Sequence, residues 1–129
     1  MSRLWSAMDV LIVDDDEDVR RTFSRALERA GYMVTAVENG LAAIAELHQQ
    51  SCSVIVCDIH MPFLEGKSFY DELSKDFPAL ARRVVFATGW AEHDDVGPFL
   101  ERTGRPVLHK PVDFKELVAA VRGVAERGD

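Results

Sequence analysis

The sequence predicts one α/β domain built around a parallel β-sheet. Short apolar runs, rich in β-branched residues, alternate along the chain with segments whose apolar residues recur at helical spacing. Val54–Cys57 is the clearest of these runs, and its lack of polar alternation is typical of a strand buried on both faces. Five such strands, separated by five helices and short links, indicate a parallel sheet covered by helices on both faces.

Composition narrows the class of protein. With 129 residues the chain is expected to fold as one domain with a substantial core. Its formal net charge of −7 argues against a nucleic-acid or anionic-membrane surface, since both require a basic face. No apolar run is long enough for a membrane span or a signal peptide near Met1. Cys52 and Cys57 lack zinc-site spacing, so we interpret them as reduced packing residues of a cytoplasmic protein.

The expected elements can be given by residue range. Residues 1–8 show no periodicity and are expected to form a loose lead-in to a domain spanning residues 9–127. Strands are expected at residues 10–13, 32–37, 54–58, 84–87 and 106–109. Helices are expected within residues 19–30, 41–48, 69–77, 99–103 and 114–125. Gly97 and Pro98 disfavour a helix interior, so we expect the fourth helix to be short with Pro98 in its first turn, or irregular in its first half.

Chemically useful side chains follow four of the five predicted strands: Asp14 and Asp15, then Asp58, Thr88 and Lys110. Parallel strands place their carboxyl ends on one edge of the sheet, where ligands collect in folds of this kind. Three carboxylates brought together there repel one another and require a cation, and all-oxygen ligation suits Mg²⁺. A lysine charge and a threonine hydroxyl beside them would hold a tetrahedral dianion.

Plainer roles remain open for single residues. Asp58 alone would be an ordinary turn-capping acid, Thr88 an ordinary strand residue and Lys110 a solvated lysine. The acids at positions 16–18 are interpreted as residues of a helix N-terminus, where the helix dipole favours negative charge. Asp14 and Asp15 directly follow the strand, so that explanation does not account for them.

Four motifs together resemble the response-regulator receiver domain of two-component signalling. They are Val-Asp-Asp at residues 13–15, Asp-Ile-His-Met-Pro at 58–62, Ala-Thr-Gly at 87–89 and Val-Leu-His-Lys-Pro at 107–111. They occur in the family's order, and the resemblance covers the chain from residue 9 onward. It implies a doubly wound, flavodoxin-like (βα)5 fold with strand order 2-1-3-4-5.

The resemblance also implies a role for each matching residue. Asp58 would be the phosphoacceptor, with Thr88 and Lys110 binding the phosphoryl group. Mg²⁺ would be bound by Asp14, Asp15, Asp58 and the backbone carbonyl of His60, with Asp14 binding it directly or through water. The Lys110–Pro111 peptide bond is commonly cis in this family.

The chain departs from the family's usual pattern at one position and is distinctive at two others. Val107 stands where receivers often carry an aromatic switch residue, which leaves open how the signal is transmitted. Trp90 and His60 lie two residues beyond Thr88 and Asp58. We interpret Trp90 either as a shield that slows hydrolysis of the acyl phosphate or as a packing or partner-anchoring residue. His60 either positions water or faces solvent.

The predicted function is that of a phosphorylatable switch in a phosphorelay, not an enzyme acting on a separate metabolite. Its partners would be a histidine kinase or phosphotransfer protein and an unidentified target, with no direct nucleic-acid or membrane contact. It would be a monomer or a phosphorylation-dependent dimer, and either a single-domain regulator or a receiver from a larger protein such as a hybrid sensor kinase. The alternatives are a receiver-like interaction module that is not phosphorylated and, less favoured, a Mg²⁺-dependent phosphohydrolase, because His60 replaces the second acid such enzymes carry.

Overall fold

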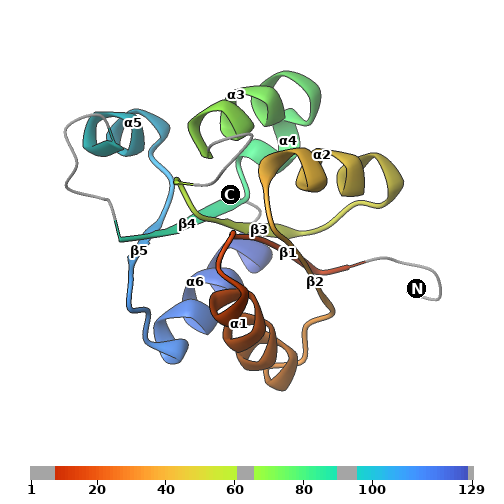
Figure 1. The fold of residues 1–129 in the computed structure, drawn as a ribbon, viewed down its shortest axis with the longest axis vertical. Helices are drawn as coiled ribbons and strands as arrows, with labels where there is room; N and C mark the ends of the chain where they lie inside the picture. Colours follow the sequence, from red (N-terminus) through yellow and green to blue (C-terminus); the bar gives the residue numbers. More distant parts are fainter. Residues whose placement is uncertain (1–7, 61–65, 90–95, 128–129) are drawn as a thin grey trace.

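The predicted parallel sheet is present in the structure. The computed structural model of the chain describes residues 8–60, 66–89 and 96–127. Its strands are β1 (Val10–Val13), β2 (Val34–Val37), β3 (Val54–Cys57), β4 (Val84–Thr88) and β5 (Val107–His109). All pair in parallel, in the order β2-β1-β3-β4-β5 (Figure 1). This confirms the expected doubly wound arrangement and its strand order.

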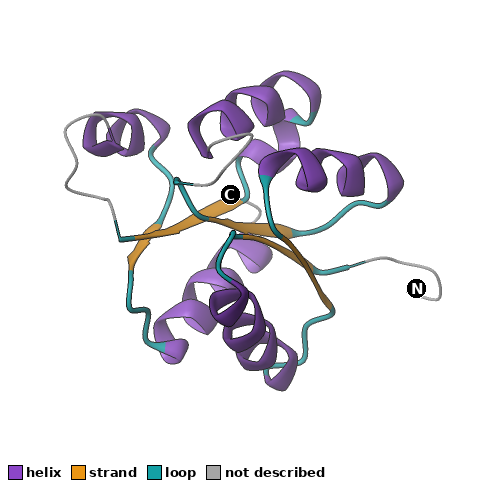
Figure 2. Ribbon diagram, in the orientation of Figure 1, coloured by secondary structure: helices purple, strands orange, loops and turns teal. Residues whose placement is uncertain are grey.

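Helices cover both faces of the sheet, as Figure 2 shows. On one face lie α1 (Glu17–Arg29) and α6 (Phe114–Arg127). On the other lie α2 (Gly40–Gln49), α3 (Gly66–Asp76), α4 (Pro78–Ala81) and α5 (Val96–Thr103). The result is a three-layer α/β/α arrangement in which the central strands have no solvent-facing side.

The core is divided by the sheet into two apolar clusters. Successive side chains of β1 point to opposite faces, so Leu11 and Val13 pack with α2, α3 and α5, whereas Val10 and Ile12 pack with α1 and α6. Every residue of β1, β3 and β4 is buried, whereas β2 and β5, at the sheet edges, are partly exposed. This explains why β1 and β3 read as continuous apolar runs in the sequence.

Local signals set the helix ends. Asp16 caps α1, its carboxylate accepting hydrogen bonds from the backbone N–H groups of Asp18 and Val19, which confirms the interpretation of the acids at residues 16–18. Beyond the other end of α1, Gly31 adopts a φ of 101°, a conformation that favours glycine. Pro98 is the third residue of α5, so this helix is short with Pro98 in its first turn, as expected.

Two local features differ from the sequence prediction. The short helix α4 was not expected, because Pro78 was interpreted only as the end of the preceding helix. It instead begins a new turn, where a proline is tolerated because a first-turn N–H has no helical partner. β2 begins at Val34 and not at Tyr32, whose backbone N–H donates to the carbonyl of Leu27 and so extends the turn that ends α1.

The two cysteines and the start of the domain are also placed by the structure. Cys52 and Cys57 are both buried free thiols, and burial raises the pKa of Cys52 to about 12, which keeps it protonated and unreactive. Met8, the last residue of the predicted lead-in, is buried against the core, while residues 1–7 lie outside the described residues. Among the helices described, none has the length and apolar character needed to cross a membrane.

Candidate phosphorylation site

The candidate site lies at the topological switch point of the sheet. The chain passes from β1 to β2 on one side and then returns to β3 on the other side, so β1 pairs with both β2 and β3. Val13 and Cys57 are paired across β1 and β3, which places the residues that follow them, Asp14 and Asp58, side by side. The backbone N–H of Asp58 donates to the carbonyl of Val13 at 2.9 Å, extending the pairing into the site. In open α/β sheets this switch point is where ligands bind.

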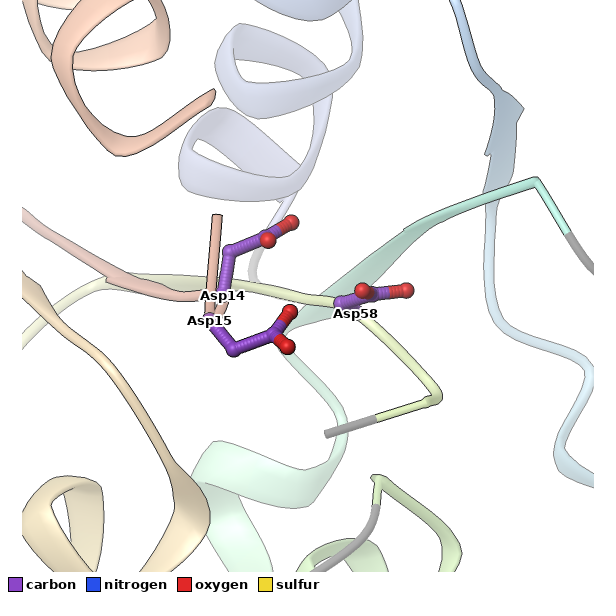
Figure 3. Close-up of side chains that lie close together, drawn as sticks. All are labelled: Asp14, Asp15 and Asp58. Carbon is purple, nitrogen blue, oxygen red and sulfur yellow. The ribbon is translucent and has the colours of Figure 1, made fainter. Parts of the chain in front are cut away.

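Three carboxylates converge there, as the sequence predicted. One ligand oxygen from each of Asp14, Asp15 and Asp58 lies within 4.8 Å of the others (Figure 3). Asp14 and Asp58 are buried, with 2% and 6% of their surface exposed, whereas Asp15 is exposed. Such a group repels itself strongly unless a cation neutralises it. Its oxygen-only donors are those a hard divalent cation prefers, so the residues fit a Mg²⁺ site.

Lys110 brings a positive charge to two of these carboxylates. Its Nζ donates to Oδ2 of Asp14 at 2.8 Å and lies 3.3 Å from Oδ2 of Asp58. Burial lowers the pKa of Lys110, but the hydrogen bond to Asp14 and the two negative charges outweigh that effect and raise its pKa above the ordinary value. Lys110 is therefore charged at neutral pH and is shared between the ends of β1 and β3.

Asp58 is the carboxylate whose ionised form is disfavoured. Burial raises its pKa above the ordinary value of 3.8, and the neighbouring charge of Asp14 acts in the same direction. The charge of Lys110 and the N–H of Ile59, which donates to Oδ1 of Asp58 at 2.7 Å, oppose the shift without cancelling it. Perturbation of this kind is frequent at functional sites.

Thr88 and Lys110 approach the site from neighbouring strands. Thr88 ends β4 and is fully buried. Its carbonyl accepts a hydrogen bond from the backbone N–H of Lys110 at 3.0 Å, next to the Thr88–His109 pair of β4 and β5. The Lys110–Pro111 peptide bond is cis, in agreement with the resemblance. The edge formed by β1, β3, β4 and β5 thus brings together all five chemically useful side chains that the sequence singled out.

Gly66 is a site residue that the sequence analysis did not identify. It begins α3, and its backbone N–H donates to the carbonyl of Ile59 at 2.8 Å. A Cβ at this position would lie 2.6 Å from the carbonyl oxygen of Asp58 and 2.7 Å from Cα of Ile59, closer than side chains approach backbone. Only glycine lets α3 pack this tightly against the chain that carries Asp58. The available signal was a glycine shortly before the helix expected within residues 69–77.

The remaining predicted residues are less directly placed. His60 is partly buried two residues beyond Asp58, and the proposed role of its carbonyl in metal binding stays a prediction. Val107 is partly buried in β5 beside Phe86 and packs against the apolar cluster on the α3 and α5 face. Trp90 lies outside the described residues, as do Met61 and Pro62, so the alternatives for Trp90 stay predictions.

The fold and this site define a class of α/β domain with acidic residues, a threonine and a lysine at the carboxyl edge of a five-stranded parallel sheet. Comparison with known proteins gives the family directly. The model of the response regulator receiver domain matches residues 10–122, and the chain belongs to this family. Receiver domains of response regulators are signalling switches and not classical enzymes.

Relatives and solved structures agree with this assignment. The response regulator receiver protein CpdR of Brucella abortus is 34% identical over 113 residues, covering 84% of this chain and 89% of that protein. The DNA-binding transcriptional regulator NtrC of Salmonella typhimurium is 32% identical over 112 residues, which cover 87% of this chain but only 24% of NtrC. A CheY-like receiver domain from Methanospirillum hungatei has the same fold, with a TM-score of 0.85, 23% identity and coverage of 95% and 97% of the two chains.

Proposed function

We propose that the chain is a phosphoacceptor receiver of a two-component phosphorelay, with Asp58 as the residue that accepts the phosphoryl group. The observation that carries the proposal is the geometry around Asp58. This carboxylate is buried, lies 3.3 Å from Lys110, and faces two further carboxylates at one sheet edge. A site of this composition neutralises charge on a transferring phosphoryl group.

The proposed reaction is a phosphoryl transfer between two side chains. An oxygen of the Asp58 carboxylate attacks phosphorus, forming an O–P bond, while the P–N bond of the donor's phosphohistidine breaks and its electron pair returns to the imidazole. Lys110 leaves its contact with Asp58 to pair with a phosphoryl oxygen, and the hydroxyl of Thr88 donates to another. Each of these groups already stands at the edge where the acyl phosphate would form.

Asp14, Asp15, Asp58 and the carbonyl of His60 would hold Mg²⁺ in this proposal. When bound, the ion would supply positive charge in addition to that of Lys110 and so offset the charge of the phosphoryl oxygens. Asp14 already uses both of its oxygens, one for the N–H of Asp16 at 2.9 Å and the other for Lys110. This arrangement favours the water-mediated mode of binding for Asp14, whereas the exposed Asp15 would bind the ion directly.

A cluster of three aromatic rings supports a route for the signal that does not need an aromatic residue at position 107. Phe86 lies two residues before Thr88 on β4, and its ring centroid is 5.7 Å from those of both Tyr70 in α3 and Phe99 in α5. Tyr70 and Phe99 are themselves 5.9 Å apart. Movement of the Thr88 end of β4 would therefore reach two surface helices. Beryllofluoride, a mimic of the acyl phosphate, should shift the NMR resonances of Tyr70 and Phe99; unchanged resonances would exclude this route.

The proposed partners are a histidine kinase or phosphotransfer protein as donor and a protein target downstream. Among the relatives, NtrC and a probable transcriptional regulator of Guillardia theta are longer proteins, and the chain spans 24% and 45% of them. CpdR of Brucella abortus, by contrast, is covered over 89% of its length. Both a single-domain regulator and a receiver of a larger protein therefore have precedents among its relatives.

The direct test is the intact mass of the protein after incubation with a small phosphodonor such as acetyl phosphate. We expect a phosphoryl adduct on the wild-type protein only when Mg²⁺ is present, and none on Asp58→Asn. Asp71→Asn, a change of an exposed carboxylate on α3, is the control and should still form the adduct.

Three outcomes would contradict the proposal. If neither the donor nor beryllofluoride modified the folded wild-type protein, the alternative of an unphosphorylated interaction module would be favoured. If the adduct persisted in Asp58→Asn, another residue would be the acceptor. Release of phosphate from many small substrates with multiple turnovers would instead favour the phosphohydrolase.

A further inference from the structure

Asp14 is held at four points, one of which comes from α1. Its backbone N–H donates to the carbonyl of Val37 at 3.1 Å, and its two carboxylate oxygens accept from Asp16 and Lys110. The fourth contact is made by Arg20, whose Nη1 donates to the carbonyl oxygen of Asp14 at 2.8 Å. The sequence analysis assigned no role to Arg20.

The contact matters because the carbonyl of Asp14 belongs to the peptide unit that leads into Asp15. A peptide unit is planar, so fixing its oxygen also fixes the direction in which the nitrogen and Cα of Asp15 leave Asp14. Asp15 is exposed, and its position within the cluster depends on this backbone direction. Arg20 therefore acts on Asp15 through the backbone, without using any carboxylate oxygen.

The chemistry of arginine suits this position. The guanidinium is charged at all accessible pH values and presents its donors in a rigid plane. Because Arg20 bonds a backbone oxygen, it brings positive charge to an acidic turn without occupying any carboxylate oxygen itself. Lys110, in contrast, pairs with the carboxylates themselves and must exchange partners when a phosphoryl group arrives.

We propose that Arg20 is a positioning residue: by holding the carbonyl of Asp14, it orients the Asp14–Asp15 peptide so that the acidic cluster is arranged for a divalent cation. The proposal rests on the proposed function in so far as the cation is Mg²⁺. Contacts that orient metal ligands typically affect metal affinity by about 10-fold or more when they are removed.

Arg21 offers a matched control on the same helix. It pairs with Asp18 at 2.6 Å on the surface, where the two side chains are 54% and 78% exposed. Arg20→Gln and Arg21→Gln remove the same charge from neighbouring positions of α1, so a general effect of net charge would be the same in both. Arg20→Lys keeps the charge and one donor at the proposed position.

The experiment uses two readouts on the full chain. In metal-free protein, hydrogen exchange of the Asp16 amide reports on the turn, because this N–H donates to Asp14. Mg²⁺ affinity is measured separately by NMR titration. We expect Arg20→Gln to speed Asp16 exchange and weaken Mg²⁺ binding about 10-fold, Arg21→Gln to change neither, and Arg20→Lys to recover most of both.

Each outcome decides the proposal. Equal effects of Arg20→Gln and Arg21→Gln, or an Arg20→Gln protein with wild-type exchange and affinity, would overturn it. If the wild type bound no Mg²⁺, the metal part of the proposed function would fail, while Asp16 exchange would still decide whether Arg20 holds the turn. If the wild type bound Mg²⁺ but formed no phosphoryl adduct, that result would count against Asp58 as acceptor, while the Arg20 proposal would still be decided by Asp16 exchange and Mg²⁺ affinity.

Discussion

The ends of β1 and β3 carry buried aspartates in adjacent positions, yet their surroundings differ. Asp14 accepts a backbone N–H at one oxygen and Lys110 at 2.8 Å at the other, within a turn that α1 closes. Asp58 accepts the N–H of Ile59 but lies farther from Lys110, at 3.3 Å, and burial raises its pKa. Both carboxylate oxygens of Asp14 therefore accept a close hydrogen bond, whereas burial disfavours the ionised form of Asp58. Reactivity is expected at the less satisfied of the two.

The largest expected effect comes from removing the positive charge of Lys110, which pairs with both aspartates. Lys110→Met keeps much of the apolar stem but withdraws positive charge from both carboxylates. We expect the rate of phosphorylation by acetyl phosphate to fall about 100-fold, the usual scale for losing one group that stabilises developing charge. Rates are measured by intact mass over time. A rate close to that of the wild type would show that Lys110 does not act on the phosphoryl group.

Next in size is the effect of a methyl group behind Asp58. Gly66→Ala would place a Cβ 2.6 Å from the carbonyl oxygen of Asp58, so the backbone must move. We expect a loss of about 2 kcal/mol in the free energy of unfolding, in the range seen for overpacked sites. Gly89→Ala is the control, because a Cβ there meets no atom of the described residues within 4 Å. Equal results from the two variants in urea denaturation would contradict the close packing of α3 on the site.

The third prediction is that replacing Asp58 or Asp14 by asparagine changes the free energy of unfolding in opposite directions at neutral pH. In the folded protein Asp58 binds a proton more readily than in the unfolded chain, so its ionisation reduces stability as pH rises above 3.8 towards its raised pKa. Asp58→Asn should therefore be more stable than the wild type at neutral pH, by about 1 kcal/mol. This advantage should disappear on acidification, when the wild-type carboxyl is protonated as well.

Asp14→Asn should act in the opposite direction at neutral pH. It exchanges a carboxylate that accepts from both Asp16 and Lys110 for an amide, which weakens a charge-assisted hydrogen bond worth about 1.5–3 kcal/mol. Thermal unfolding of the two variants at several pH values measures both effects. The same sign for both at neutral pH would contradict the distinction between the ends of β1 and β3.

Local sequence was sufficient to predict much of this site. Asp14, Asp58, Thr88 and Lys110 each follow or end a short apolar strand, and parallel pairing alone brings such positions to one edge. The order of the strands required the family resemblance, because apolar runs do not specify their neighbours.

Features that depend on tertiary contacts were not predictable in the same way. Gly66 is required by the approach of α3 to the backbone of Asp58, and Arg20 by the path of its side chain to the carbonyl of Asp14. Lys110 Nζ lies 2.8 Å from Asp14 Oδ2 and 3.3 Å from Asp58 Oδ2. A difference of this size between two distances cannot be predicted from the pattern of residue types. The first turn of α4 at Pro78 was missed because proline is typical both of a helix end and of a helix start.

The measurement that tests the account most directly is the intact mass of wild type and Asp58→Asn after exposure to acetyl phosphate, with and without Mg²⁺. The account predicts one phosphoryl adduct, dependent on Mg²⁺, on the wild-type protein, with peptide mapping locating it at Asp58. An adduct of the same yield on Asp58→Asn, or none on a wild type that is folded and also fails to bind beryllofluoride, would contradict the assignment of Asp58 as the phosphoacceptor.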